Sequence, residues 1–285
     1  MQKKTGLVLE GGAMRGLFTA GVLDVMMEQK LLFDGAIGVS AGACFGCNYK
    51  SGQIGRSLRY NLKYCKDKRY CSVYSLLKTG DLYGAEFCYH TLPETLDRFD
   101  YDTYRKHPME FHVVCTDIET GKPVYHAIPE MDYEALEWIR ASASMPMVSR
   151  VVEIGGRKML DGGMTDPIPL AYFESRGYGR NVVILTQPRE YRKESNKTIP
   201  MLKIALRNYP KAIEVMRNRH TVYNQTTQYV FEAEKAGRAF VICPPEALPI
   251  KRITRDAKLL QQVYEIGRSV AIRQLPALRS FLQQP

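Results

Sequence analysis

The chain has 285 residues, of which 45% are hydrophobic and 25% charged, and these proportions exclude a disordered chain and a fibrous repeat. The apolar runs end well before the roughly 20 residues that span a bilayer, and Glu10 comes too early for a signal peptide, so we expect a cytoplasmic protein that can contact the inner face of the membrane peripherally. The formal net charge of +10 favours an anionic partner, a lipid surface or a nucleic acid, without choosing between them.

The first fifty residues contain two successive strand, turn and helix units. Thr5 to Glu10 is predicted to be a short buried strand, with a helix from about Met14. Gly35 to Val39 is a second apolar strand, and a helix of small residues follows from Ala41. Two such units in succession predict a parallel sheet.

Residues 51–108 contain no convincing buried strand and are predicted to form a helical insertion that caps the sheet, as a lid over a site would. Basic residues here alternate with tyrosines, which suits a membrane interface or stacked bases, although a solvated helix face is the simpler interpretation. The cluster consists of Arg56, Arg59, Lys63, Lys66, Lys68 and Arg69, with Tyr60, Tyr64 and Tyr70.

Strands and helices alternate again after residue 110. The predicted elements are a strand at Phe111–Thr116, a strand at Pro123–His126, a helix at Tyr133–Ala143, a hairpin of Val151–Ile154 and Lys158–Leu160, and a strand at Asn181–Leu185. Residues 200–285 are expected to be mainly helical, with a long helix from Pro210, a strand at Ala239–Cys243 and a final helix from about Asp256. The whole predicts one α/β domain over residues 1–285, a three-layer sandwich with a mostly parallel central sheet.

Residues 38–42 form the pattern GxSxG at a predicted strand-to-helix turn. Gly38 and Gly42 permit the sharp bend that exposes a serine above a sheet, and the N-terminus of the next helix favours an oxyanion. A turn packed for steric reasons can have the same composition. Ser40 is therefore a candidate nucleophile.

A second glycine-containing turn follows the first strand. Gly11, Gly12 and Ala13 can aim consecutive backbone N–H groups at a negatively charged oxygen, while Arg15 and Gly16 complete the turn. Arg15 can hold the loop or meet an anionic head group. The spacings of the common phosphate-binding loops are missing here, which disfavours a nucleotide site.

Asp161 follows the predicted hairpin and precedes Gly162 and Gly163. Glycines on one side let this carboxylate approach another loop closely, as a general base must. Alone, the tripeptide is a common turn. The three motifs in this order form a specific pattern.

The pattern resembles the patatin-like phospholipases, in which EGGAMRG, GVSAG and DGG match the oxyanion, nucleophile and aspartate motifs. The resemblance extends from about residue 5 to residue 170 and includes segments near Thr116, Ala143 and Asp166. Ala13 stands where many members have a third glycine, and Asp166 where many have Asn. Neither departure removes a catalytic group.

This resemblance implies a Ser-Asp dyad in which Asp161 accepts the proton of Ser40, with Gly11, Gly12 and Ala13 as the oxyanion hole. The implied reaction is hydrolysis of an acyl ester of a lipid, such as a phospholipid or lysophospholipid, through an acyl-enzyme, without a metal or cofactor. Arg15, Gly16, Gly38, Gly42, Gly162 and Gly163 would support these residues. No nucleic acid is expected as a partner, and the sequence does not indicate the oligomeric state.

Other interpretations stay open at this point. His220 follows Asp161 and could complete a Ser-His-Asp triad. Its spacing, however, places it with Met216 and Tyr223 on one stripe of a long helix, as a packed or core-edge residue. A lipid-binding protein without turnover and a basic nucleic-acid-binding protein are the alternatives from other classes. Cys44 and Cys47 form a CxxC, but it lies inside a predicted helix and no second pair completes a zinc site.

Overall fold

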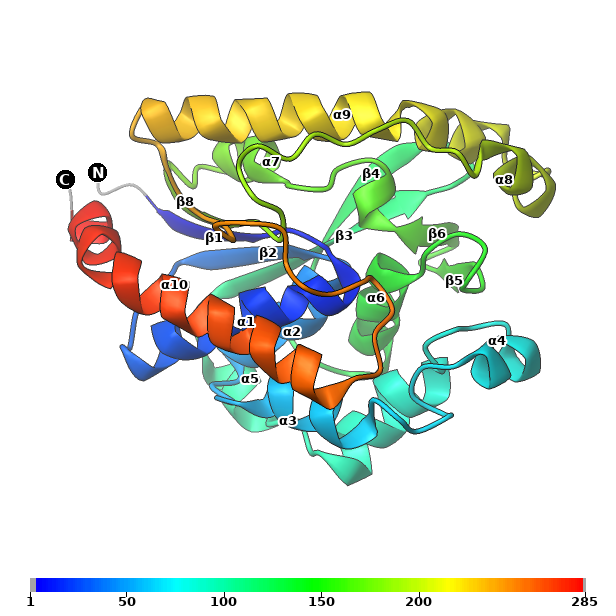
Figure 1. The fold of residues 1–285 in the computed structure, drawn as a ribbon, viewed down its shortest axis with the longest axis horizontal. Helices are drawn as coiled ribbons and strands as arrows, with labels where there is room; N and C mark the ends of the chain where they lie inside the picture. The colour runs from blue at the N-terminus through cyan, green and yellow to red at the C-terminus, as the bar shows by residue number, and fades with distance from the viewer. Residues whose placement is uncertain (1–3, 284–285) are drawn as a thin grey trace.

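The computed structural model of the chain describes residues 4–283, which fold around one eight-stranded sheet (Figure 1). Its order is β5-β6-β3-β2-β1-β7-β8, with β4 paired to β3. The strands are β1 (Thr5–Leu9), β2 (Gly35–Val39), β3 (Glu110–Asp117), β4 (Lys122–Ala127), β5 (Val152–Ile154), β6 (Arg157–Asp161), β7 (Arg180–Ile184) and β8 (Ala239–Ile242). The five strands from β3 to β8 along this order are parallel, whereas β4, β5 and β6 join in antiparallel pairs. The predicted mostly parallel α/β sheet is confirmed.

Helices cover both faces of the sheet, which makes the three predicted layers (Figure 1). Leu7 and Leu9 of β1 pack into the core beneath α1, α2 and α10, while Val8 between them packs into the core beneath α7 and α9. A strand buried on both faces has no polar alternation, which explains its continuous apolar run. The helices are α1 (Gly16–Glu28), α2 (Ala41–Lys50), α3 (Arg56–Tyr64), α4 (Val73–Thr79), α5 (Tyr101–Lys106), α6 (Tyr133–Ala143), α7 (Leu170–Ser175), α8 (Ile199–Ala205), α9 (Pro210–Lys235) and α10 (Ala257–Gln283), with short turns η1 (Ala13–Arg15) and η3 (Gly162–Met164) and a π-helix η2 (Phe87–Leu96).

The last helix packs along the first one. Every residue of α1 from Gly16 to Met26 is buried, because α10 covers the side that the sheet leaves free. The two backbones touch at two glycines. A Cβ at Gly21 would lie 2.1 Å from the carbonyl oxygen of Tyr264, and one at Gly267 would lie 2.1 Å from that of Phe18. Residues more than 240 positions apart thus share one core.

Residues 51–108 are helical, as predicted, and contain α3, α4, η2 and α5. The expectation of a solvated basic face is wrong in part. Arg56 is buried and donates to Asn48 Oδ1 at 2.8 Å and to the carbonyl oxygen of Asp97 at 2.7 Å, while Arg59 pairs with the carboxylate of Asp97. The three tyrosines of the cluster, Tyr60, Tyr64 and Tyr70, are also buried. They build the interior of the insertion, since their rings pack on one another and on Phe87.

Among residues 4–283 there is no helix both long and apolar enough to pass through a bilayer.

Candidate active site

Ser40 occupies the turn between β2 and α2 with φ +55°, a left-handed conformation that is rare outside glycine. The turn is tight on both sides. A Cβ at Gly38 would lie 2.5 Å from the backbone of Gly42, and one at Gly42 would lie 2.4 Å from the carbonyl oxygen of Leu9. Only glycine fits at these two positions, so GxSxG here has a steric cause. The backbone N–H of Ser40 donates to Ser142 Oγ at 2.9 Å, which helps to hold the strained residue.

The register of β3 brings Asp161 beside Ser40. Val114 of β3 is paired with Val39 of β2, and the next residue, Cys115, is paired with Asp161 at the end of β6. The strand β6 runs antiparallel to β2, and the C-terminal ends of the two strands therefore meet beside β3. Both Ser40 and Asp161 line the same pocket.

Asp161 is a buried carboxylate with few partners. Burial raises its pKa, while the nearby guanidinium of Arg219, a hydrogen bond with Ser40 and the N–H of Gly163 act in the opposite direction. The Gly163 N–H lies 2.7 Å from Asp161 Oδ1. A buried carboxylate with a raised pKa is a stronger base than a solvated one.

The turn after β1 borders the same pocket. A Cβ at Gly11 would lie 2.9 Å from Ser40 Cβ, so this loop touches the serine. Within the described residues, 4–283, no acceptor receives the backbone N–H groups of Gly11, Gly12 and Ala13. Ala13 has φ +49°, a conformation that explains why glycine suits this position. Three backbone N–H groups without an acceptor, next to the Ser40 hydroxyl, can stabilise a negatively charged oxygen by hydrogen bonds.

The remaining motif residues lie around this centre. Arg15 and Gly163 line the pocket, Gly16 begins α1, and Gly162 begins the turn η3 directly after Asp161.

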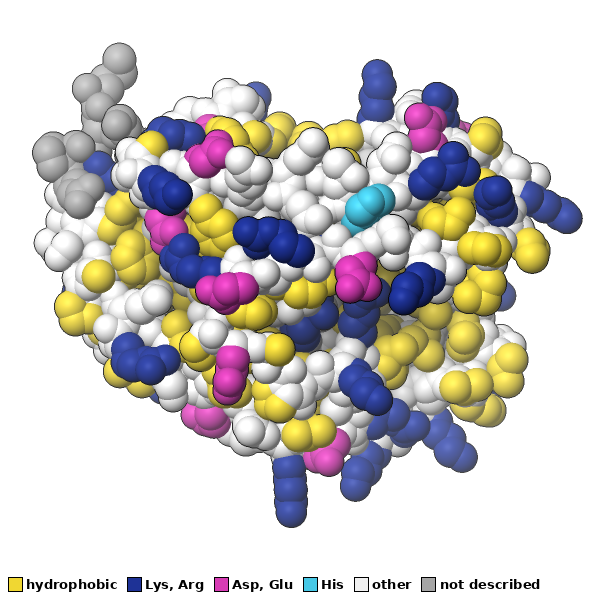
Figure 2. All heavy atoms as spheres, turned by 45° about the horizontal axis from the view of Figure 1, so that its top comes forward, with side chains coloured by type: hydrophobic (Ala, Val, Ile, Leu, Met, Phe, Trp, Pro, Cys, Tyr) yellow, Lys and Arg dark blue, Asp and Glu magenta, His cyan; other side chains and the backbone are white. Residues whose placement is uncertain are grey.

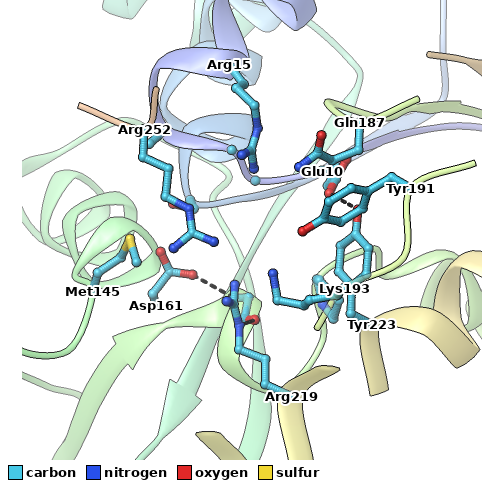
Figure 3. A pocket seen from close by; sticks show the side chains of 16 residues that line it. Glu10, Arg15, Met145, Asp161, Gln187, Tyr191, Lys193, Arg219, Tyr223 and Arg252 are labelled. Atoms are coloured by element: carbon cyan, nitrogen blue, oxygen red, sulfur yellow. Dashed lines mark hydrogen bonds between the residues drawn. The ribbon is translucent and has the colours of Figure 1, made fainter. Parts of the chain in front are cut away.

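Several pocket residues were not predicted as site residues: Glu10, which precedes Gly11, and Arg219, which a distant helix supplies. Glu10 is buried and accepts hydrogen bonds from the Thr186 N–H at 2.5 Å and from the Tyr223 hydroxyl at 2.8 Å, and its burial raises its pKa. Arg219 donates from Nε to the carbonyl oxygen of Gly163 at 2.6 Å and so ties α9 to the turn after Asp161 (Figure 3). In the sequence, only the position of Arg219 three residues after the buried Met216 indicates that its side chain faces inward.

His220 does not reach Ser40. It is half-buried, as expected of a residue at the edge of the core, and its Nδ1 lies 3.1 Å from the carbonyl oxygen of Arg217. It is absent from the lining of the pocket that holds Ser40, whereas its neighbour Arg219 points into that pocket. Among the described residues no histidine lines this pocket.

Ser40 lies where two cavities meet. The polar pocket is bordered by Glu10, Arg15, Asp161, Lys193, Arg219 and Arg252 among others. The apolar cavity measures about 320 Å3 and is bordered by aromatic and aliphatic side chains that include Phe45, Tyr60, Tyr70, Tyr83, Leu82 and Leu136. Four residues border both, namely Ala13, Ser40, Met145 and Arg252. A group that bridges the two cavities would have one polar end and one apolar end.

No cluster of metal-ligating side chains exists among residues 4–283. Cys44 and Cys47 are free thiols on α2, and burial raises the pKa of Cys44 to about 12.

The family model described as "Patatin-like phospholipase" matches residues 7–174, and a model described as a domain of unknown function, DUF6363, matches residues 209–283. The uncharacterized protein YjjU of Escherichia coli strain K12 is 27% identical over 284 positions, which cover 93% of this chain and 75% of that protein. The uncharacterized NTE family proteins Rv1063c of Mycobacterium tuberculosis and Mb1092c of Mycobacterium bovis are each 26% identical over 168 residues, 59% of this chain. That match covers 45% of the mycobacterial proteins. The crystal structure of VipD from Legionella pneumophila has a TM-score of 0.49 and 11% identity, covering 97% of this chain and 67% of that one.

Proposed function

Since the chain belongs to the patatin-like phospholipase family, we propose that it hydrolyses acyl esters of lipids with Ser40 as the nucleophile and Asp161 as the general base. One observation carries the proposal. The Ser40 side chain lies at the junction of a polar pocket, which holds a buried carboxylate and three free amides, and an apolar cavity large enough for part of an acyl chain.

In the proposed first step, Asp161 accepts the hydroxyl proton of Ser40 while Oγ attacks the ester carbonyl carbon. The carbonyl oxygen becomes negative and takes hydrogen bonds from the backbone N–H groups of Gly11, Gly12 and Ala13, each worth about 3 kcal/mol in reactions of this kind. The ester C–O bond then breaks, and the leaving alcohol takes the proton from Asp161. Ser40 is left acylated.

In the second step, Asp161 takes a proton from water, whose oxygen attacks the acyl carbon. The bond to Ser40 breaks, Oγ regains its proton from Asp161, and a fatty acid leaves. The proton balance closes with one water consumed for each ester.

The acyl chain would lie in the apolar cavity. Its lining comes from α2, from the insertion at residues 51–108 and from α6, so the insertion would act as a cap over the chain. Burial of apolar surface would supply the binding energy, at about 0.8 kcal/mol for each methylene.

Covalent labelling tests the proposal. The purified protein would be treated with a fluorophosphonate probe, with and without lipid micelles, and the modified residue mapped by mass spectrometry. Label on Ser40 is expected, and it should vanish in Ser40→Ala. Absence of label from Ser40 under both conditions would reject the nucleophile and favour a lipid-binding role without turnover.

The base is tested by Asp161→Asn against His220→Ala on a short-chain p-nitrophenyl ester. Loss of a general base typically lowers kcat by about 100-fold or more, so Asp161→Asn should be nearly inactive while His220→Ala keeps most activity. The Tm of Asp161→Asn should not fall, because burial disfavours the charge that it removes. The reverse pattern of activities would refute the dyad.

A further inference from the structure

Four cationic side chains turn toward the space in front of Ser40 and Asp161. They are Arg15, Lys193, Arg219 and Arg252, and Figure 3 shows that they come from four separate segments of the chain. Figure 2 shows Lys and Arg side chains gathered in a hollow near the centre of one face, with a hydrophobic region beside it. Among residues 4–283, the carboxylates that line this pocket are Glu10 and Asp161, so the formal charge of the lining is +2.

These cations lack the close carboxylate partners that several basic residues have elsewhere on the molecule. None of the four lies within 4.0 Å of a carboxylate oxygen among residues 4–283, whereas Arg56, Arg189 and Arg268 do. In the same part of the chain, Arg15 Nε is buried and has no hydrogen-bond partner.

The arrangement is unfavourable without an anion. Burial lowers the pKa of Lys193 to about 7, and repulsion from Arg219, Arg252 and Arg15 acts in the same direction. Burial likewise lowers the pKa of Arg219. Like charges that are partly buried together repel strongly, and a bound anion would relieve that repulsion.

Two of the four charges, those of Lys193 and Arg219, are also held in place. The segment that carries Lys193 is pinned to α9, since the Lys193 N–H donates to Asn224 Oδ1 at 2.8 Å and Asn224 Nδ2 donates back to the Lys193 carbonyl at 3.0 Å. Lys193 Nζ lies over the Tyr223 ring at 5.0 Å from its centre. The Arg219 side chain is held by Gly163. Lys193 and Arg219 are therefore preorganised, and Arg15 and the exposed Arg252 complete the cluster.

We propose that Arg15, Lys193, Arg219 and Arg252 bind the phosphate group of the substrate. The inference rests on the proposed function and narrows it to acyl esters that carry an anionic phosphate, such as a lysophosphatidate, over neutral acylglycerols and choline head groups. The acyl chain fills the apolar cavity on one side of Ser40, and the phosphate enters the polar pocket on the other. Guanidinium groups suit this task because they bind phosphate oxygens in pairs.

Three substrates with one oleoyl chain test the preference in mixed micelles: 1-oleoyl-lysophosphatidate, 1-oleoyl-lysophosphatidylcholine and 1-oleoylglycerol. The wild type should hydrolyse the lysophosphatidate with a kcat/KM at least about 10-fold above that for the neutral glycerol ester, as expected for charge-assisted hydrogen bonds. Lys193→Met and Arg252→Gln should lower that ratio about 10-fold, mainly through KM. Arg217→Gln, an exposed residue of the same helix as Arg219, is the matched control and should keep the wild-type ratio.

A lower ratio in Lys193→Met would not be caused by unfolding. The substitution removes a partly buried charge that neighbouring arginines repel, so the Tm of the free protein should rise. A wild-type ratio near 1, or a ratio that Lys193→Met and Arg252→Gln leave unchanged, would overturn the proposal.

Binding to Ser40→Ala separates this inference from the proposed hydrolysis. Calorimetric titration with sn-glycerol 3-phosphate and with inorganic phosphate should show binding of both, the glycerol ester more tightly, and loss of both in Arg252→Gln. Binding without any esterase activity of the wild type would retain the anion site and reject the hydrolase. Equal affinity for the two probes would mean a free-phosphate site and, like no binding at all, would reject the head-group assignment.

Discussion

Replacement of Ser142 by alanine tests how the nucleophile turn is held. Ser142 is fully buried on α6, and its Oγ accepts the Ser40 N–H at 2.9 Å and donates to the Val114 carbonyl at 2.6 Å. Ser142→Ala leaves both backbone groups buried without a partner, at roughly 1–3 kcal/mol each. We expect the free energy of unfolding to fall by about 2–4 kcal/mol, partly offset because no hydroxyl is desolvated, and the Tm by about 4–8 °C.

The assay combines thermal unfolding with hydrolysis of an uncharged p-nitrophenyl ester. Because the lost bond holds the Ser40 backbone and touches no substrate, kcat should fall while KM stays close to its wild-type value. Ser175→Ala, which removes an exposed hydroxyl bonded to the Tyr172 carbonyl, is the control and should shift the Tm by less than about 1 °C. A Ser142→Ala protein with the Tm and kcat of the wild type would refute this account of the turn.

Three further predictions concern packing and pH. Gly267→Ala places a Cβ 2.1 Å from the Phe18 carbonyl, so α10 must move away from α1, and the loss of about 1–3 kcal/mol should be visible as a lower Tm by circular dichroism. Asp161 must be ionised to act as a base, and burial raises its pKa above 3.8; activity should therefore be lost as pH falls through a value above 3.8. Arg219→Gln removes a charge that lowers this pKa and should move the acid limb of kcat/KM to higher pH; a shift to lower pH would contradict the electrostatic reasoning.

Local patterns in the sequence predict most of the sheet. Continuous apolar runs identified β1, β2 and β7 within one residue at either end, because strands buried on both faces have no polar positions. The hairpin of β5 and β6 was predicted from Gly155 and Gly156, and both have positive φ. The strands that lead to Ser40 and Asp161 could therefore be predicted from the sequence.

Their surroundings depend on contacts between distant segments, which no local pattern encodes. The periodicity of α9 correctly predicted Met216 and Tyr223 as buried and His220 as a residue at the edge of the core, but it did not identify Arg219 as a residue of the pocket. Arg219 turns inward because the Gly163 carbonyl and Asp161 lie opposite it, and those residues belong to another part of the chain. Lys193 and Arg252 lie outside secondary structure, where spacing carries no directional information.

The close contact of α10 with α1 bears on how the protein is made. A ribosome that has released only the segment matched by the patatin-like model leaves α1 without α10, β1 without β7 and Gly163 without Arg219. The nascent chain then exposes a wide apolar surface and has an incomplete polar pocket. At about 5–20 residues per second, the hundred or so residues from 174 to 283 take several seconds or more to synthesise. During that interval the growing chain exposes apolar surface that the finished protein buries, and the polar pocket at Ser40 is completed only after Arg219 and Arg252 have been synthesised.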